Sequence, residues 1–151
     1  MLLLHHATAA AILGIAALPI LGALGPSPAL AEARPQENLP ICRGGKRITC
    51  VVDGDTLWLD GEKIRVLGID APEVGNTAKC RKEVATGRVA TERFRELVSA
   101  GSIELRRDGS DRYGRTLARV LVDGRDAGAQ LVDEGLAVPY RGRNTAEPWC
   151  R

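Results

Sequence analysis

Aromatic side chains are scarce in this sequence, with two Trp, two Tyr and one Phe among 151 residues. A groove that holds single-stranded nucleic acid by stacking alone would need more of them. The excess of positive charge is also small, 21 Lys and Arg against 19 Asp and Glu, which excludes a histone-like polycation but not a local basic site. The length is that of one domain, and a charged fraction of 26% is typical of folded proteins.

Charged side chains are absent before Glu32. Residues 7–24 are almost entirely apolar, a Gly-Pro-Ser-Pro stretch follows, and small residues lead up to Ala31. This order is typical of a secretory signal peptide, so we expect cleavage near Ala31 and an exported protein, periplasmic or secreted. The alternative is an uncleaved membrane anchor, because about 18 apolar residues can span a bilayer and the start has His5 and His6 where basic residues are usual.

Histidine occurs only at positions 5 and 6, inside the expected signal peptide. A mature chain without histidine has no His-activated nucleophile and no His ligand for a metal ion. The base of any catalytic site would therefore be a carboxylate.

Four cysteines follow the signal peptide, and none of them forms a CxxC motif, which argues against a structural zinc site. An even number of cysteines in an exported chain predicts two disulfides, with three possible pairings. We favour Cys42–Cys50, across a hairpin whose loop is centred on Lys46, and Cys80–Cys150.

The rest of the chain alternates short strand patterns with two helical ones. We predict strands over 47–52, 56–59, 63–67, 103–106 and 116–122, and helices over 83–99 and 126–134. Three strands, a long helix, two strands and a short helix predict an α+β fold built on a five-stranded OB-fold barrel. The expected organisation is a signal peptide over 1–31, a linker and hairpin arm over 32–46, the folded domain over 47–140 and a tail over 141–151.

Acidic residues stand at the ends of two of these strands. Asp53 and Asp55 flank a glycine after the first strand, and Asp70 and Glu73 follow the third. If these strands share a sheet, the carboxylates would gather at one end and suit a hard cation such as Ca²⁺. The alternative is that Asp-Gly-Asp is only a turn, since Asp and Gly favour turns for local reasons.

Two arginines extend this set. Arg65 lies in the third strand, and Arg115 ends the segment DRYGR. A guanidinium fits phosphate oxygens in a bidentate way, so the two would balance charge that builds up on a phosphodiester. Each could instead pair with a surface carboxylate, which usually contributes little. Glu73 is the candidate base, and with an ordinary pKa of about 4.3 it would need a cation nearby to activate water.

Three blocks of the sequence together resemble the staphylococcal nuclease (thermonuclease) family over roughly residues 47–140. The blocks are VVDGDTLWLDGEKIRVLGIDAPE (51–73), DRYGRTLARVLVDG (111–124) and LVDEGLA (131–137). The resemblance implies an OB-fold, Ca²⁺ as cofactor and hydrolysis of DNA and RNA, single-stranded or locally melted, to 3′-phosphate products. It also implies a monomer with no stable protein partner.

The resemblance also implies roles for single residues. Asp55 and Asp70 match the calcium carboxylates, and Ala71 matches the position whose backbone carbonyl binds the metal. Glu73 matches the acid that activates or positions the attacking water. Asp53 matches an acid that does not bind the metal directly, with a role in supporting the metal ligands or in the turn.

Substrate contacts are implied in the same way. Arg65 and Arg115 match the pair that contacts the scissile phosphate, while Tyr113 and Tyr140 match residues that contact the nucleotide. The alternative function is a non-catalytic OB-fold module that binds nucleic acid or protein, but modules of that kind usually lack part of the Arg–Glu–Arg set.

Two departures from thermonuclease concern the cysteines, and with them the chain resembles a cysteine-containing, secreted bacterial branch of the family. The loop after Glu73 is shorter and contains Cys80, and a short tail with Trp149 and Cys150 replaces the C-terminal helix. We expect the Cys80–Cys150 disulfide to tie this loop to the tail.

Overall fold

The structure is a computed structural model that describes residues 38–142 and 148–151. The predicted signal peptide or anchor, and the linker up to residue 37, lie outside the described residues. Within the described part, no helix is both long and apolar enough to cross a membrane.

A mixed sheet forms the centre of the described domain. Its strands follow the order β1-β2-β3-β6-β5, and their bounds are β1 Cys50–Asp53, β2 Thr56–Leu59, β3 Glu62–Val66, β6 Thr116–Val122 and β5 Ile103–Ser110. The β3–β6 pair is parallel, and the other pairs on this path are antiparallel. Three short strands complete the set: β7 (Arg125–Asp126) pairs with β6, and β4 (Ile69–Asp70) pairs with β8 (Val138–Pro139).

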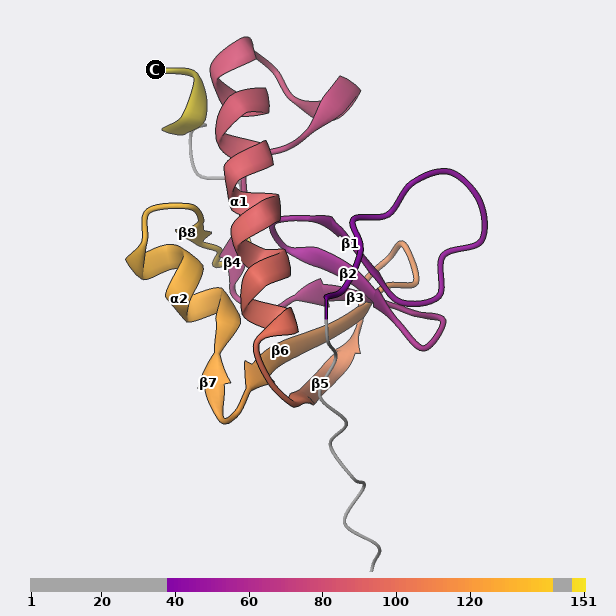
Figure 1. Ribbon diagram of the computed structural model, residues 1–151. Coiled ribbons are helices and arrows are strands. Elements are labelled where there is room, and N and C mark those ends of the chain that lie inside the picture. The colour runs from indigo at the N-terminus through magenta and orange to yellow at the C-terminus, as the bar shows by residue number, and fades with distance from the viewer. Residues whose placement is uncertain (1–37, 143–147) are drawn as a thin grey trace, which may run out of the picture. The chain divides into compact units, whose positions relative to one another are not determined.

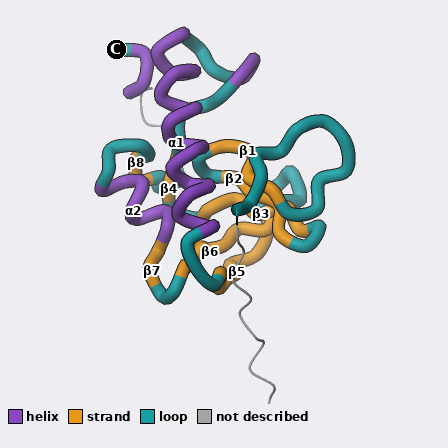
Figure 2. Tube along the Cα trace, viewed as in Figure 1, coloured by secondary structure: helices purple, strands orange, loops and turns teal. Residues whose placement is uncertain are grey.

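One long and one short helix accompany the sheet, as the sequence predicts (Figures 1 and 2). α1 spans Arg81–Ser99 and begins two residues before its predicted start, because the Cys80 side chain accepts the backbone N–H of Glu83 as an N-cap. α2 spans Ala127–Asp133, and the Asp126 side chain caps it through Ala129 N. Two 3₁₀ turns flank these elements: η1 (Gly75–Thr77) and η2 (Pro148–Cys150).

The core lies between α1, α2 and one face of the sheet. Alternation along β2 and β3 buries Leu57 and Ile64, and the apolar face of α1 supplies Phe94. α1 contacts β1, and α2 contacts β6 (Figure 1). The chain therefore has the predicted α+β architecture, in which five strands follow one path through the main sheet.

The segment before β1 differs from the predicted hairpin. Ile41 forms a parallel bridge with Val51, and the N–H of Cys42 donates to Val51 O over 2.7 Å. The reason is the burial of Leu39, which is 2% exposed and whose N–H donates to Ser99 Oγ. Residues 43–49 consequently form a wide loop, after which β1 runs parallel to the segment around Ile41.

Both predicted disulfides are present in the structure. Cys42 and Cys50 close the wide loop, while Cys80 and Cys150 join the start of α1 to η2. No free cysteine remains among the described residues.

Candidate active site

The turn between β1 and β2 brings Asp55 against the start of the segment after β4. Asp55 is 6% exposed, and its Oδ2 accepts the backbone N–H of Ala71 over 2.9 Å. Gly54 permits this approach, because a Cβ at that position would lie 2.8 Å from the Cβ of Ala71 and 3.0 Å from that of Ala90. The Asp-Gly-Asp motif therefore forms a turn and also places a buried carboxylate.

Arg65 forms ion pairs with both predicted metal-binding carboxylates, Asp55 and Asp70. Its Nη1 forms an ion pair with Asp55 Oδ2, and its Nη2 donates to Asp70 Oδ1 over 3.0 Å. Burial, and then the charge of Asp53, raises the pKa of Asp55 to about 7, against the opposing effect of Arg65. Burial and the charge of Asp55 likewise raise the pKa of Asp70. The site thus holds more negative charge than one guanidinium balances.

This donor set fits a hard divalent cation. The carboxylates of Asp55 and Asp70 lie together with the Ala71 backbone, and these described groups offer oxygen ligands. The raised pKa values reflect repulsion and desolvation that a bound cation would relieve. A second group, Cys80, Glu83 and Cys150, has ligand atoms within 4.8 Å of one another, but its sulfurs form a disulfide.

Glu73 follows at two residues from Ala71, with its side chain exposed. Its backbone is fixed from α1, because the Glu73 N–H donates to Glu83 Oε1 over 3.3 Å. A Cβ at Gly87 would lie 2.4 Å from Glu73 O and 2.7 Å from Pro72 O, so the helix packs directly on this backbone.

Arg115 and Tyr113 lie on the turn between β5 and β6. Arg115 Nε donates to Asp111 Oδ2 over 2.7 Å, and the guanidinium carbon lies 5.6 Å from the centre of the Tyr113 ring. The β3–β6 register pairs Arg65 with Leu117, so Arg115 lies directly before β6 and two residues before the partner of Arg65. The Tyr113 side chain is 68% exposed and available to a ligand.

Tyr140 directly follows β8 and lies beside the start of β4. Its N–H donates to Gly68 O over 2.8 Å, which continues the β4–β8 pairing that aligns Asp70 with Val138. The Tyr140 side chain is 37% exposed.

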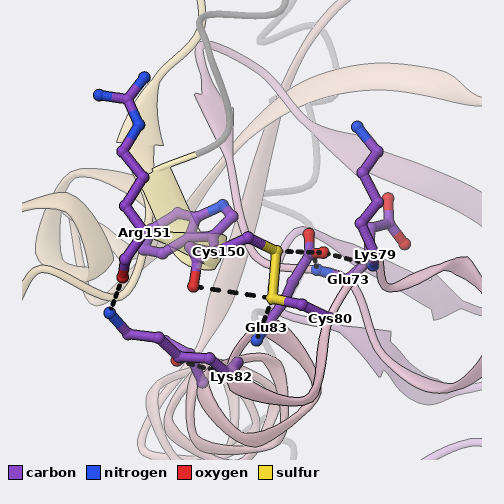
Figure 3. The surroundings of a disulfide bond; sticks show 9 residues. Glu73, Lys79, Cys80, Lys82, Glu83, Cys150 and Arg151 are labelled. Carbon is purple, nitrogen blue, oxygen red and sulfur yellow. Dashed lines mark hydrogen bonds between the residues drawn. A yellow bond between two sulfur atoms is a disulfide. The ribbon is translucent and has the colours of Figure 1, made fainter.

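Two residues that the sequence analysis did not single out position these groups. The Glu83 carboxylate is 4% exposed and accepts from the backbone N–H groups of Glu73 and Lys79, the latter over 2.6 Å (Figure 3). The spacing Cys80-x-x-Glu83 is that of a capping box, with Cys in place of the usual Ser or Thr. Asp111 accepts from the backbone N–H groups of Tyr113 and Arg115 as well as from the Arg115 side chain.

Comparisons with known proteins find similar sequences. Residues 63–148 match the family described as Staphylococcal nuclease homologue. Endonuclease YncB of Bacillus subtilis is 40% identical over 93 residues, which cover 57% of this chain and 43% of that protein. An uncharacterized endonuclease of Haemophilus influenzae is 33% identical over 100 residues, covering 63% and 52%.

A thermonuclease of Staphylococcus intermedius is 34% identical over 94 residues, which cover 58% of this chain and 54% of that protein. The chain thus spans about half the length of these relatives. The family match includes Arg65, Asp70, Glu73 and Arg115 and more than half of the sequence. On this evidence the chain belongs to the staphylococcal nuclease homologue family.

Proposed function

We propose that the protein is an exported, calcium-dependent nuclease that hydrolyses phosphodiester bonds of DNA and RNA and leaves 3′-phosphate products. The observation that supports this most is the ion-paired set of Asp55, Arg65 and Asp70, with Asp55 bonded to the Ala71 backbone two residues before Glu73. The names of the endonuclease and thermonuclease relatives point to the same chemistry. The uncharged, apolar N-terminus and the two disulfides support export.

The proposed reaction uses the chain's own groups as follows. Glu73 takes a proton from a water molecule, whose oxygen attacks phosphorus in line with the 5′ oxygen. The bond from phosphorus to the 5′ oxygen breaks, the phosphate stays on the 3′ oxygen, and the leaving 5′ oxygen takes a proton from water. Arg65 and Arg115 stabilise the additional charge on the phosphoryl oxygens.

The metal-binding part belongs to Asp55, Asp70 and the Ala71 carbonyl. Bound there, Ca²⁺ would withdraw charge from a phosphate oxygen and from water. Asp111 holds Arg115 in place, and the exposed Tyr113 ring beside it provides a surface for the sugar or base. We propose that the protein works as a monomer on single-stranded or locally melted nucleic acid.

The test is cleavage by the purified full chain, with disulfides formed, of single-stranded DNA and RNA oligonucleotides in calcium or in chelator. We expect cleavage in calcium only and products with 3′-phosphate ends.

The arginine variants test the site itself. Arg65→Ala and Arg115→Ala should each lower kcat about 10²–10³-fold. Arg119→Ala is the matched control, because this exposed arginine of β6 has its one ion pair within the described residues with Asp126. Binding without cleavage would contradict the proposal and favour a non-catalytic module.

A further inference from the structure

The wide loop over residues 43–49 is strongly basic. It contains Arg43, Lys46 and Arg47 and no acid, and these three side chains are exposed. Within the described residues none of the three has an ion-pair or hydrogen-bond partner. Many exposed arginines elsewhere are neutralised by a carboxylate, for example Arg93 by Glu134. The loop therefore presents three uncompensated positive charges.

A groove of about 740 Å³ runs against this loop. The three cations line it together with Ile41 and Ile48, which are 37% and 50% exposed. α1 closes the other side with Arg95, whose charge Glu92 already balances. Cations match the phosphates of a nucleic-acid strand, and the exposed isoleucines beside them offer apolar contact to its sugars.

The loop is anchored at both ends. The Cys42–Cys50 disulfide closes it, Ile48 O accepts the N–H of Gly61, and Thr49 Oγ1 accepts the N–H of Asp60. A pre-ordered loop loses less entropy on binding than a free one, so its charges contribute more to affinity.

Hydrogen bonds place the loop at the turn between β2 and β3, where Ile48 and Thr49 accept from Gly61 and Asp60. β3 runs from this turn toward the candidate active site, and Arg65 is four residues along the chain from Gly61. At about 3.3 Å for each strand residue, the Cα atoms of Gly61 and Arg65 lie about 13 Å apart. At least about four stacked nucleotides, at about 3.4 Å each, span this distance.

We propose that the loop over 43–49 and its groove form a second binding site for the nucleic-acid strand, which holds phosphates several nucleotides away from the one that is cut. This inference rests on the proposed nuclease function and adds a substrate subsite to it. The site binds by charge, because Arg43, Lys46 and Arg47 are cations of its described lining that no described carboxylate pairs.

The experiment measures KM and kcat of the full chain, over a range of salt, on a dinucleotide and on a single-stranded oligonucleotide of about 12 nucleotides, a length within OB-fold site sizes. The variant Arg43→Gln/Lys46→Gln/Arg47→Gln should raise KM for the longer strand about 10- to 100-fold at low salt. The slope of log KM against log salt concentration should fall by about 2, because each of the three lost phosphate contacts contributes about 0.7 to that slope. KM for the dinucleotide should change less than about twofold, since it cannot reach the loop.

The control for formal charge is Arg88→Gln/Arg106→Gln/Arg125→Gln, at exposed sites outside the loop and its groove, where Arg106 is paired with Glu104. Arg43→Lys/Arg47→Lys should keep the salt slope of the wild type, because it retains the positive charges. This variant separates the effect of charge from any effect of the substitutions on folding. Equal salt slopes for the loop variant and the control would overturn the second site while leaving the nuclease intact. No cleavage of either substrate by the wild type would instead overturn the proposed function.

Discussion

Glu83 is the residue through which α1 holds the backbone of the candidate base. Its buried carboxylate accepts the N–H groups of Glu73 and Lys79, from a position on the first turn of the helix. The positive end of the helix dipole favours the negative carboxylate there. Glu83 touches no proposed reacting atom and is therefore a positioning residue.

We predict that Glu83→Ala lowers kcat about 10–100-fold and leaves KM nearly unchanged, because misplacement of Glu73 weakens the reaction and not the binding. It should also lower the free energy of unfolding by about 1–3 kcal/mol, since two backbone donors lose their partner. Steady-state kinetics and denaturant unfolding measure the two effects.

Glu83→Gln is the control for this prediction, because its amide oxygen can still accept one of the two N–H groups. It should recover most of the lost kcat. Equal kinetics for Glu83→Ala and wild type would show that the Glu73 loop needs no support from the helix.

The candidate site could be predicted where local motifs define it. Asp55 lies in a turn motif, and Arg65 and Asp70 are five residues apart on consecutive strands, so the sequence brings them close. Glu83 could not be assigned this way. Its partner Glu73 is ten residues away across a loop, and an N-cap made by Cys80 is unusual.

At the scale of elements, the contact between α1 and the Pro72–Glu73 backbone depends on Gly87. An alanine here would stabilise an isolated helix by about 1 kcal/mol. In this protein its Cβ would lie 2.4 Å from Glu73 O, and the overpacking should cost about 1–3 kcal/mol.

We therefore predict that Gly87→Ala is less stable than wild type and has a lower kcat, as measured by thermal unfolding and by oligonucleotide cleavage. Val89→Ala, at a 56% exposed position of the same helix, should change stability by less than about 0.5 kcal/mol. A Gly87→Ala protein that is more stable and fully active would show that the helix can move away from Glu73.

Glu62 links three strands through its carboxylate. Oε1 accepts from Thr116 Oγ1 over 2.7 Å, and Arg107 pairs with Oε2 over 2.7 Å. These two hydrogen bonds, that of Arg107 first, lower the pKa of Glu62 from 4.5 to about 2. The folded state therefore releases the proton more readily than the unfolded state.

A lowered pKa gives stability that is complete above about pH 4.5 and is lost as the pH falls toward 2. We predict that Glu62→Gln removes this part of the acid dependence, about 1 kcal/mol once solvent screening of the half-exposed pair is considered. Denaturant unfolding at a series of pH values measures it, with Glu104→Gln of β5 as control. An unchanged pH profile would contradict the linkage.

Element boundaries show where sequence patterns fail. β5 runs to Ser110, past the predicted end at Arg106, because pairing with β6 continues through polar residues. The parallel bridge of Ile41 and Val51 depends on the burial of Leu39 beneath α1, a tertiary contact that no local pattern contains. The helices were predictable because their apolar faces and cap at Asp126 are local.

At the scale of the whole described domain, the two disulfides close loops of very different length. Cys42–Cys50 spans 8 residues, whereas Cys80–Cys150 spans 70 and joins η2 to the N-cap of α1. Lys82 Nζ adds a hydrogen bond to Arg151 O, and Cys150 Sγ lies 3.8 Å from Glu83 Oε2 (Figure 3). Cys150 of η2 therefore contacts the residue that positions the Glu73 loop.

We predict that Cys80→Ser/Cys150→Ser lowers the free energy of unfolding by about 4 kcal/mol and Cys42→Ser/Cys50→Ser by about 2.5 kcal/mol, because the longer closed loop restricts the unfolded chain more. Serine keeps an N-cap at position 80, so loss of the cap does not contribute. Only the first variant should lower kcat on a dinucleotide, since only that disulfide adjoins Glu83. Denaturant unfolding and cleavage kinetics measure both effects, and an equal or reversed order of stability would contradict the chain-entropy argument. A fully active Cys80→Ser/Cys150→Ser protein would show that this disulfide stabilises the fold without positioning the Glu73 loop.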